Sequence, residues 1–185
     1  MEKQNYNFTD VKKYLKGNMK SIISVFVISS IFFGCNNKSS QEYLSEANIK
    51  IENQEYKEAV NKFEYIVKEF PESSEAPQAL MKLALIYQSR SIENIRVDSS
   101  FMKSAFYYGE VFKKYPDSKD APKALFMSGF INANELHNFT EAKKIYEKFI
   151  DIYPNDELAS SAKNEIENLG VPAEKIIEKK ISKKI

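Results

Sequence analysis

The sequence of 185 residues contains one cysteine, one histidine and no tryptophan. A single cysteine excludes an intramolecular disulfide and any metal site built from several cysteines. Because His137 is the only histidine, no serine–histidine–aspartate triad can form elsewhere in the chain. The five glycines are too scattered for a phosphate-binding loop. The sequence therefore predicts a protein that is not an enzyme and that uses no metal, cofactor or small-molecule substrate.

Charge of one sign and long hydrophobic runs are also missing. The chain carries 27 basic and 26 acidic residues, and this balance argues against a nucleic-acid binder, which usually has a basic excess. The main apolar run, Ser21–Gly34, is shorter than the ~20 residues that a membrane-spanning helix needs. Lysine, glutamate, alanine, isoleucine and leucine dominate the rest. This composition is typical of amphipathic helices, and the length suits one domain.

The apolar run Ser21–Gly34 ends directly at Cys35 and follows a lysine-rich stretch that ends at Lys20. A basic stretch followed by ~7–15 apolar residues is the pattern of a secretory signal peptide. The end of the run, "IFFGC", resembles the lipobox of bacterial lipoproteins. This resemblance implies that the chain is cut before Cys35, whose sulfur and amine then carry lipid. An uncleaved membrane anchor and a buried core segment are the alternatives.

The chain after Cys35 contains three similar segments, which begin at Glu55, Ser100 and Asn138. Within each segment, apolar residues recur at the spacing of one helical face before a proline ends the pattern. The aligned prolines are Pro71, Pro116 and Pro154. Each unit therefore predicts two helices. Neither helix can bury its apolar stripe alone, so the units must stack on one another.

The three units resemble the tetratricopeptide repeat, a helix pair with small residues where its two helices cross. The matching residues are Ala47, Ala59, Phe63 and Pro71 in the first unit, Leu83, Ala84, Tyr87, Tyr108 and Pro116 in the second, and Gly129, Ala142, Tyr146 and Pro154 in the third. In the second unit Ser104 replaces the usual alanine. The resemblance implies an all-α fold, a tetratricopeptide-like superhelix of three helix pairs. A closing segment, Ala159–Gly170, predicts a C-terminal capping helix.

These features divide the chain into four predicted segments. Residues 1–34 form the lipoprotein signal peptide, in which Met19 is a possible true start, and residues 35–40 form a lipidated tether. Residues 41–169 form the tetratricopeptide-repeat domain, and residues 170–185 form a basic tail. The tail is a solvated terminus, a helix that docks on a partner, or a tether to anionic lipid or wall polymer.

The linker "FPESSEAPQAL" and its copy "YPDSKDAPKAL" are longer than the turns of the standard repeat. Such linkers after a lipobox are similar to those of the outer-membrane assembly lipoproteins (the BamD-like group) and the Tol-Pal-associated coordinators. BamD-like proteins have about five units, and this chain has three. The resemblance implies a lipid-anchored scaffold on the periplasmic face of the outer membrane. Its partners would be envelope proteins, such as β-barrel assembly components. A coordinator of cell division, or an accessory of wall-polymer or polysaccharide export, is the alternative.

In the tetratricopeptide family the first helix of each pair lines a concave groove that binds peptides. Carried over by position, the groove residues are Leu44, Asn48, Ile51 and Glu52, then Gln78, Met81, Leu85 and Gln88, then Lys123, Phe126, Phe130 and Asn134. The apolar members would supply affinity and the amides would hydrogen-bond a peptide backbone. The alternative is that the apolar members pack on neighbouring helices.

The second unit also carries an insertion, Gln88–Ser99, between helices that normally abut. Surface insertions are tolerated at little entropic cost, so an extended helix and a plain loop are one interpretation. The other interpretation is a partner contact through Ile92, Ile95 and Arg96.

Overall fold

The computed structural model describes residues 38–172, 174–176 and 178. This part of the chain contains helices and no strands; the helices are α2 (Ser40–Glu52), α3 (Tyr56–Glu69), α4 (Glu75–Gln88), α5 (Val97–Lys114), α6 (Ala121–Asn134), α7 (Phe139–Ile152) and α8 (Ala159–Asn168). None of the described helices is both long enough and apolar enough to cross a bilayer. The predicted signal peptide, Met19, Cys35 and the end of the tail lie outside the described residues.

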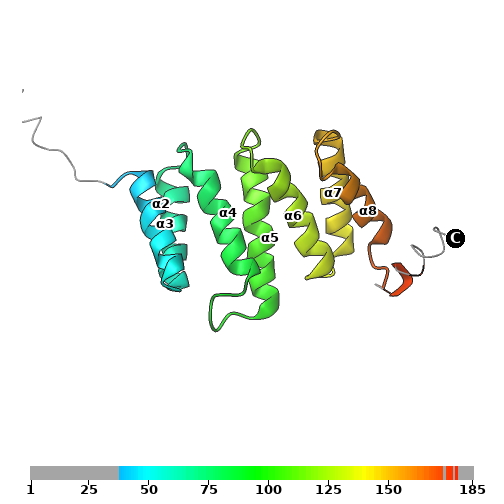
Figure 1. Cartoon of the computed structure of the whole chain (residues 1–185), viewed down its shortest axis with the longest axis horizontal. Coiled ribbons are helices and arrows are strands. Elements are labelled where there is room, and N and C mark those ends of the chain that lie inside the picture. The colour runs from blue at the N-terminus through cyan, green and yellow to red at the C-terminus, as the bar shows by residue number, and fades with distance from the viewer. Residues whose placement is uncertain (1–37, 173, 177, 179–185) are drawn as a thin grey trace, which may run out of the picture. The chain divides into compact units, whose positions relative to one another are not determined.

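Consecutive helices stand side by side along the chain, as Figure 1 shows. Each helix packs against the next one along the chain, from α2 to α8, and α2 also contacts α4. The all-α, tetratricopeptide-like arrangement of three helix pairs with a capping helix is confirmed. The helices extend from Ser40 to Asn168. Each of these bounds lies one residue before the corresponding bound of the predicted repeat domain, residues 41–169.

Local sequence signals explain where the helices begin and end. Ser39 caps α2 in a capping box, in which its hydroxyl accepts from the backbone N–H of Glu42 and the Glu42 carboxylate accepts from the backbone N–H of Ser39. The helices α3, α5 and α7 all end two residues before the aligned prolines, because proline cannot continue a helix and disfavours helical backbone in the residue before it. The turns that follow return the chain to the next pair.

Small residues lie where the helices cross. Ala47 on α2 and Ala59 on α3 have no exposed surface, and Phe63 fills the space beside them. Buried side chains of this kind form one core cluster from α2 to α6 and a second from α6 to α8. Each pair therefore completes its core against the next, as stacked repeats must.

A methyl group at Gly129 is expected to destabilise the fold. A β-carbon there would lie 2.9 Å from Cε1 of the buried Tyr146 and 3.2 Å from Cγ2 of Ile145. The overpacking of Gly129→Ala should cost about 1–3 kcal/mol, which outweighs the better helix propensity of alanine. In the matched Gly109→Ala variant the nearest atom lies 3.8 Å away, so propensity alone acts and stability should rise by about 0.5–1 kcal/mol. Urea denaturation followed by circular dichroism measures the free energy of unfolding of both variants. It should fall in Gly129→Ala and rise in Gly109→Ala, and a change of the same sign in both would contradict the prediction.

The insertion forms the loop between α4 and α5. Ile92 is buried and Ile95 is half-buried against the first core cluster, and the Ser100 hydroxyl donates to the Tyr87 carbonyl at 2.6 Å. The interpretation of Ile92 as a partner contact is therefore wrong, because its side chain anchors the loop to the core. Arg96 remains exposed and lies 3.6 Å from the Asp98 carboxylate.

Candidate peptide-binding face

The first helix of each pair carries the residues predicted to line a groove, and the structure separates them by exposure. The exposed residues are Glu52, Gln78, Leu85, Lys123 and Asn134, the half-buried ones are Asn48, Ile51, Met81, Gln88 and Phe130, and the buried ones are Leu44 and Phe126. Most of the predicted set is therefore available to a ligand.

Two of the predicted groove residues belong to the core instead. Leu44 is buried in the first cluster between α2 and its neighbours. The Phe126 ring centre lies 5.4 Å from that of Tyr146 and 5.9 Å from that of Phe149, inside the second cluster. The prediction for Leu44 and Phe126 is corrected, because Leu44 is buried in the first core cluster and Phe126 packs against Tyr146 and Phe149 of α7.

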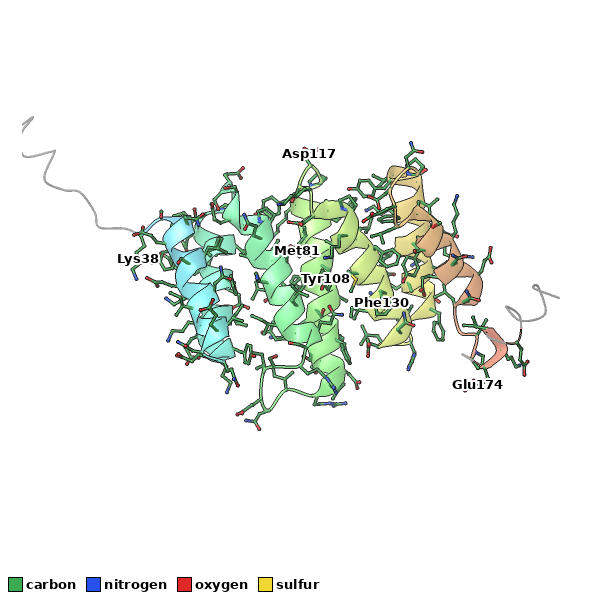
Figure 2. All side chains as sticks on the ribbon, in the orientation of Figure 1. Lys38, Met81, Tyr108, Asp117, Phe130 and Glu174 are labelled. Carbon is green, nitrogen blue, oxygen red and sulfur yellow. The ribbon has the colours of Figure 1, made fainter. Side chains whose placement is uncertain are left out.

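Apolar surface remains on α4 and α6. Leu85 is 47% exposed, while Met81 and Phe130 are half-buried against the first core cluster. Figure 2 shows Met81 on α4 and Phe130 on α6, with Tyr108 of α5 between them in that view. These three side chains are the members of the predicted set that keep apolar surface on α4 and α6.

Tyr108 connects the core to this face. Its ring is almost fully buried, and its hydroxyl donates to Oε1 of Gln88 at 2.8 Å. Burial raises the pKa of Tyr108 to about 12, so the phenol stays neutral and keeps donating at physiological pH. The bond fixes the Gln88 side chain at the end of α4, which orients its amide for a ligand.

The other amides are also held by local hydrogen bonds. Nε2 of Gln78 donates to the Ser74 carbonyl at 3.1 Å, and Nδ2 of Asn134 donates to the Phe130 carbonyl at 3.2 Å. Each of these amides carries a carbonyl oxygen with two lone pairs. The face therefore offers hydrogen-bond acceptors at Gln78 near the start of α4 and at Asn134 near the end of α6.

Two cavities lie at opposite ends of α4 and α6. At one end, Gln88 and Asn134 line a common cavity of about 540 Å³ together with Arg90 and His137. The structure thus brings together two predicted residues that lie far apart in the sequence. His137 borders this cavity as an exposed residue in the turn after α6.

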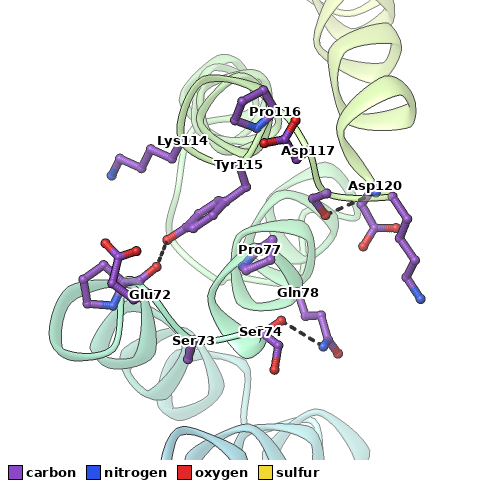
Figure 3. Close-up of a pocket in the computed structure, with 13 residues that line it drawn as sticks. Glu72, Ser73, Ser74, Pro77, Gln78, Lys114, Tyr115, Pro116, Asp117 and Asp120 are labelled. Carbon is purple, nitrogen blue, oxygen red and sulfur yellow. Dashed lines mark hydrogen bonds between the residues drawn. The ribbon is translucent and has the colours of Figure 1, made fainter.

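The cavity at the other end measures about 810 Å³ and lies between the two copies of the extended linker. Figure 3 shows how the Tyr115 hydroxyl reaches across to donate to the Pro71 carbonyl, a bond of 2.8 Å. Residues of both charges line it, among them Lys114 and Asp117. Sequence reasoning found Gln78 here but missed the cavity, although the copied linkers were a visible signal.

A further apolar surface lies outside the predicted face. Phe106 and Met102 on α5 are 60% and 61% exposed, and they border a cavity of about 490 Å³ with Leu136 and Ile145. One signal could have found it. The run Phe106–Tyr108 places three aromatics in succession, and a helix cannot turn three consecutive side chains toward one core.

The described residues show surfaces suited to binding. Among the residues that the structure describes, no three His, Cys, Asp or Glu side chains lie close enough together to hold a metal ion. In a comparison with known families, the model of a family described as outer membrane lipoprotein, YfiO, matches residues 36–171. None of the curated proteins matches the chain.

Proposed function

Because the chain belongs to the YfiO family of outer membrane lipoproteins, we propose that it is a non-enzymatic scaffold on the periplasmic face of the outer membrane, anchored by lipid on Cys35. The family match begins at residue 36, directly after the cysteine at which the lipobox resemblance starts the mature chain. Acyl chains contribute ~0.8 kcal/mol per buried CH₂, so several chains would hold the scaffold on the membrane.

The role that these features support best is the assembly of outer-membrane proteins, through capture of peptide segments on the face of α4 and α6. The observation that carries this proposal is that Met81 and Leu85 of α4 and Phe130 of α6 keep apolar surface, while Gln78 and Asn134 on the same two helices offer amide oxygens. An extended or helical peptide would bury apolar side chains against these three residues. Its backbone N–H groups would donate to the amide oxygens of Gln78 and Asn134.

Substitution of Leu85 tests this role. Leu85→Asp is expected to lower the recovery of envelope partners about tenfold, because an interface anchor typically contributes more than 1 kcal/mol and a carboxylate there would be desolvated without a partner. Leu85 is 47% exposed, so the fold should tolerate the change. The measurement is quantitative mass spectrometry of proteins crosslinked in cells and purified from membranes.

Phe106→Asp is the matched control, because Phe106 is a similarly exposed apolar residue outside the face. Unchanged partners in Leu85→Asp, or equal losses in both variants, would contradict the role of this face. Phe126→Ala is unsuitable as a test because Phe126 is buried in the core. Recovery of wall polymer in place of envelope proteins would favour the export alternative.

A further inference from the structure

The first helix pair carries an aromatic cluster that the scaffold function does not use. Tyr43 of α2 lies 4.5 Å from Tyr65 of α3 and 6.0 Å from Phe70, measured between ring centres. The centres of Tyr65 and Phe70 are 6.1 Å apart. Tyr65 is 42% exposed, and Tyr43 and Phe70 are half-buried. The three rings therefore form one surface that is apolar in its body and polar at its phenol groups.

Two lysines flank these rings. Nζ of Lys38 lies 5.9 Å from the ring centre of Tyr43, and Nζ of Lys62 lies 5.8 Å from it. Both ammonium groups pair with the single carboxylate of Glu46, and together they hold the pKa of Glu46 at about 2. The surface thus combines tyrosine rings with lysine ammonium groups beside them, which is the chemistry of a membrane–water interface.

The position of this surface matches the predicted anchor. Lys38 follows Cys35 by three residues, and an extended chain spans at most ~3.3–3.6 Å per residue. A lipid on Cys35 therefore holds Lys38 within about 11 Å of the anchored cysteine. Tyr43 lies in the first two turns of α2, and Phe70 ends the antiparallel α3. The cluster is therefore at the end of the helix pair that the anchor brings to the membrane.

If the first helix pair faces the membrane, its outer surface should carry more aromatic side chains than the outer surface of α8 at the other end of the array. Terminal repeats need a polar outer face to stay soluble. The capping helix α8 meets this need with exposed Ser160, Lys163, Asn164 and Glu167. The first pair also exposes polar residues, among them Ser45, Glu64 and Lys68, but adds the exposed ring of Tyr65 and the half-buried rings of Tyr43 and Phe70. A membrane that covers these rings would explain the difference.

We propose that Tyr43, Tyr65 and Phe70, with Lys38 and Lys62, form a contact surface for the lipid headgroup zone of the membrane. The rings enter the zone between headgroups and acyl chains. The two ammonium groups share one carboxylate, Glu46, so a net positive charge remains to meet lipid phosphates. This inference rests on the proposed lipid anchor at Cys35. The contact adds orientation to the anchor: it fixes the first helix pair against the bilayer and leaves the face of α4 and α6 open to the periplasm.

A single-tryptophan experiment tests the contact, since the natural sequence has no tryptophan. The chain from Cys35 to Ile185, which contains the whole folded unit, is coupled through its only thiol to a maleimide phospholipid. The vesicles contain phosphatidylethanolamine and phosphatidylglycerol, with or without bromine on the upper acyl chain. In Tyr65→Trp, bromine is expected to lower the emission about twofold, since indoles settle at the headgroup level.

Phe106→Trp is the control, because Phe106 is 60% exposed on α5. Its emission should be the same in both kinds of vesicle, and circular dichroism should show the same helicity for both variants. Absence of quenching in Tyr65→Trp overturns the proposal and leaves a protein partner as the occupant of the cluster. Equal quenching in both variants also overturns it, because the membrane contact would then have no orientation. Chemical coupling supplies the anchor, so these outcomes do not depend on lipidation in cells.

Discussion

Cys35→Ser is expected to abolish incorporation of a fatty-acid label into the protein and to block removal of the segment before residue 35. A serine hydroxyl lacks the nucleophilicity of a thiol toward the lipid donor, and Cys35 is the only cysteine in the chain. The loss should therefore be complete. The measurement is metabolic labelling with an alkyne fatty acid, together with mass spectrometry of the N-terminal peptide.

Asn36→Ser is the control and should keep both the label and the cleavage. A label that persists in Cys35→Ser would contradict the lipid anchor. An unlabelled, uncleaved chain in the natural protein would favour the alternative of an uncleaved anchor. The same peptides decide where translation starts, because the uncleaved Cys35→Ser chain begins with either Met1 or Met19.

In a second variant, an ordinary cleavable signal replaces the first 34 residues and Ser replaces Cys35. This chain is expected to leave the membrane fraction and appear in the soluble periplasmic fraction. At ~0.8 kcal/mol per buried CH₂, two or three acyl chains contribute far more than the aromatic cluster of the first helix pair can supply alone. Retention of the unlipidated chain on membranes would show that its protein surfaces suffice for binding.

The fold could be predicted from the sequence because the same pattern of residues occurs in three units. Ala59 and Ala142 occupy one register position, and Pro71 and Pro154 another. A position that needs a small residue, or one that must end a helix, leaves few choices of residue. Such positions are recognisable without knowledge of what lies next to them.

The binding face could be read only in part, because exposure depends on the neighbouring repeat. Phe126 and Phe130 lie one helical turn apart on α6, yet Phe126 packs against the second helix of its own pair while Phe130 stays half-buried. A rotation of a helix by a few tens of degrees decides between these outcomes. The amphipathic pattern does not fix that angle, since the stacking of the pairs sets it.

The cavities could not be predicted from the sequence, because residues of different helix pairs form them. Gln88 and Asn134 meet at one cavity because α4 and α6 end at the same edge of the array. The hydrogen bond from Tyr108 to Gln88 joins residues of different helices, and the spacing of residues along the sequence does not predict it. Sequence patterns therefore locate helices and their core faces, while the geometry between pairs decides which polar groups converge.

Phe149→Ala is expected to remove about 3–5 kcal/mol from the stability of the C-terminal part of the array. Phe149 has no exposed surface, and its ring centre lies 5.9 Å from that of Phe126 and 5.5 Å from that of Tyr153. The second core cluster, from α6 to α8, contains few other large buried side chains. The cavity left by the missing ring would therefore affect most of that cluster.

The consequence should be a loss of cooperativity as well as of stability. Stacked repeats contact only their neighbours, so each part of the array is stabilised locally. Whole domains have stabilities of about 5–15 kcal/mol, so a loss of this size should let α7 and α8 unfold before α2 and α3. Hydrogen exchange should then show faster exchange in α7 and α8 alone, and urea denaturation should show two transitions. The exposed Phe106→Ala control should change stability by less than about 0.5 kcal/mol. A single transition in Phe149→Ala, with uniform exchange along the helices, would mean that the two core clusters unfold as one cooperative unit.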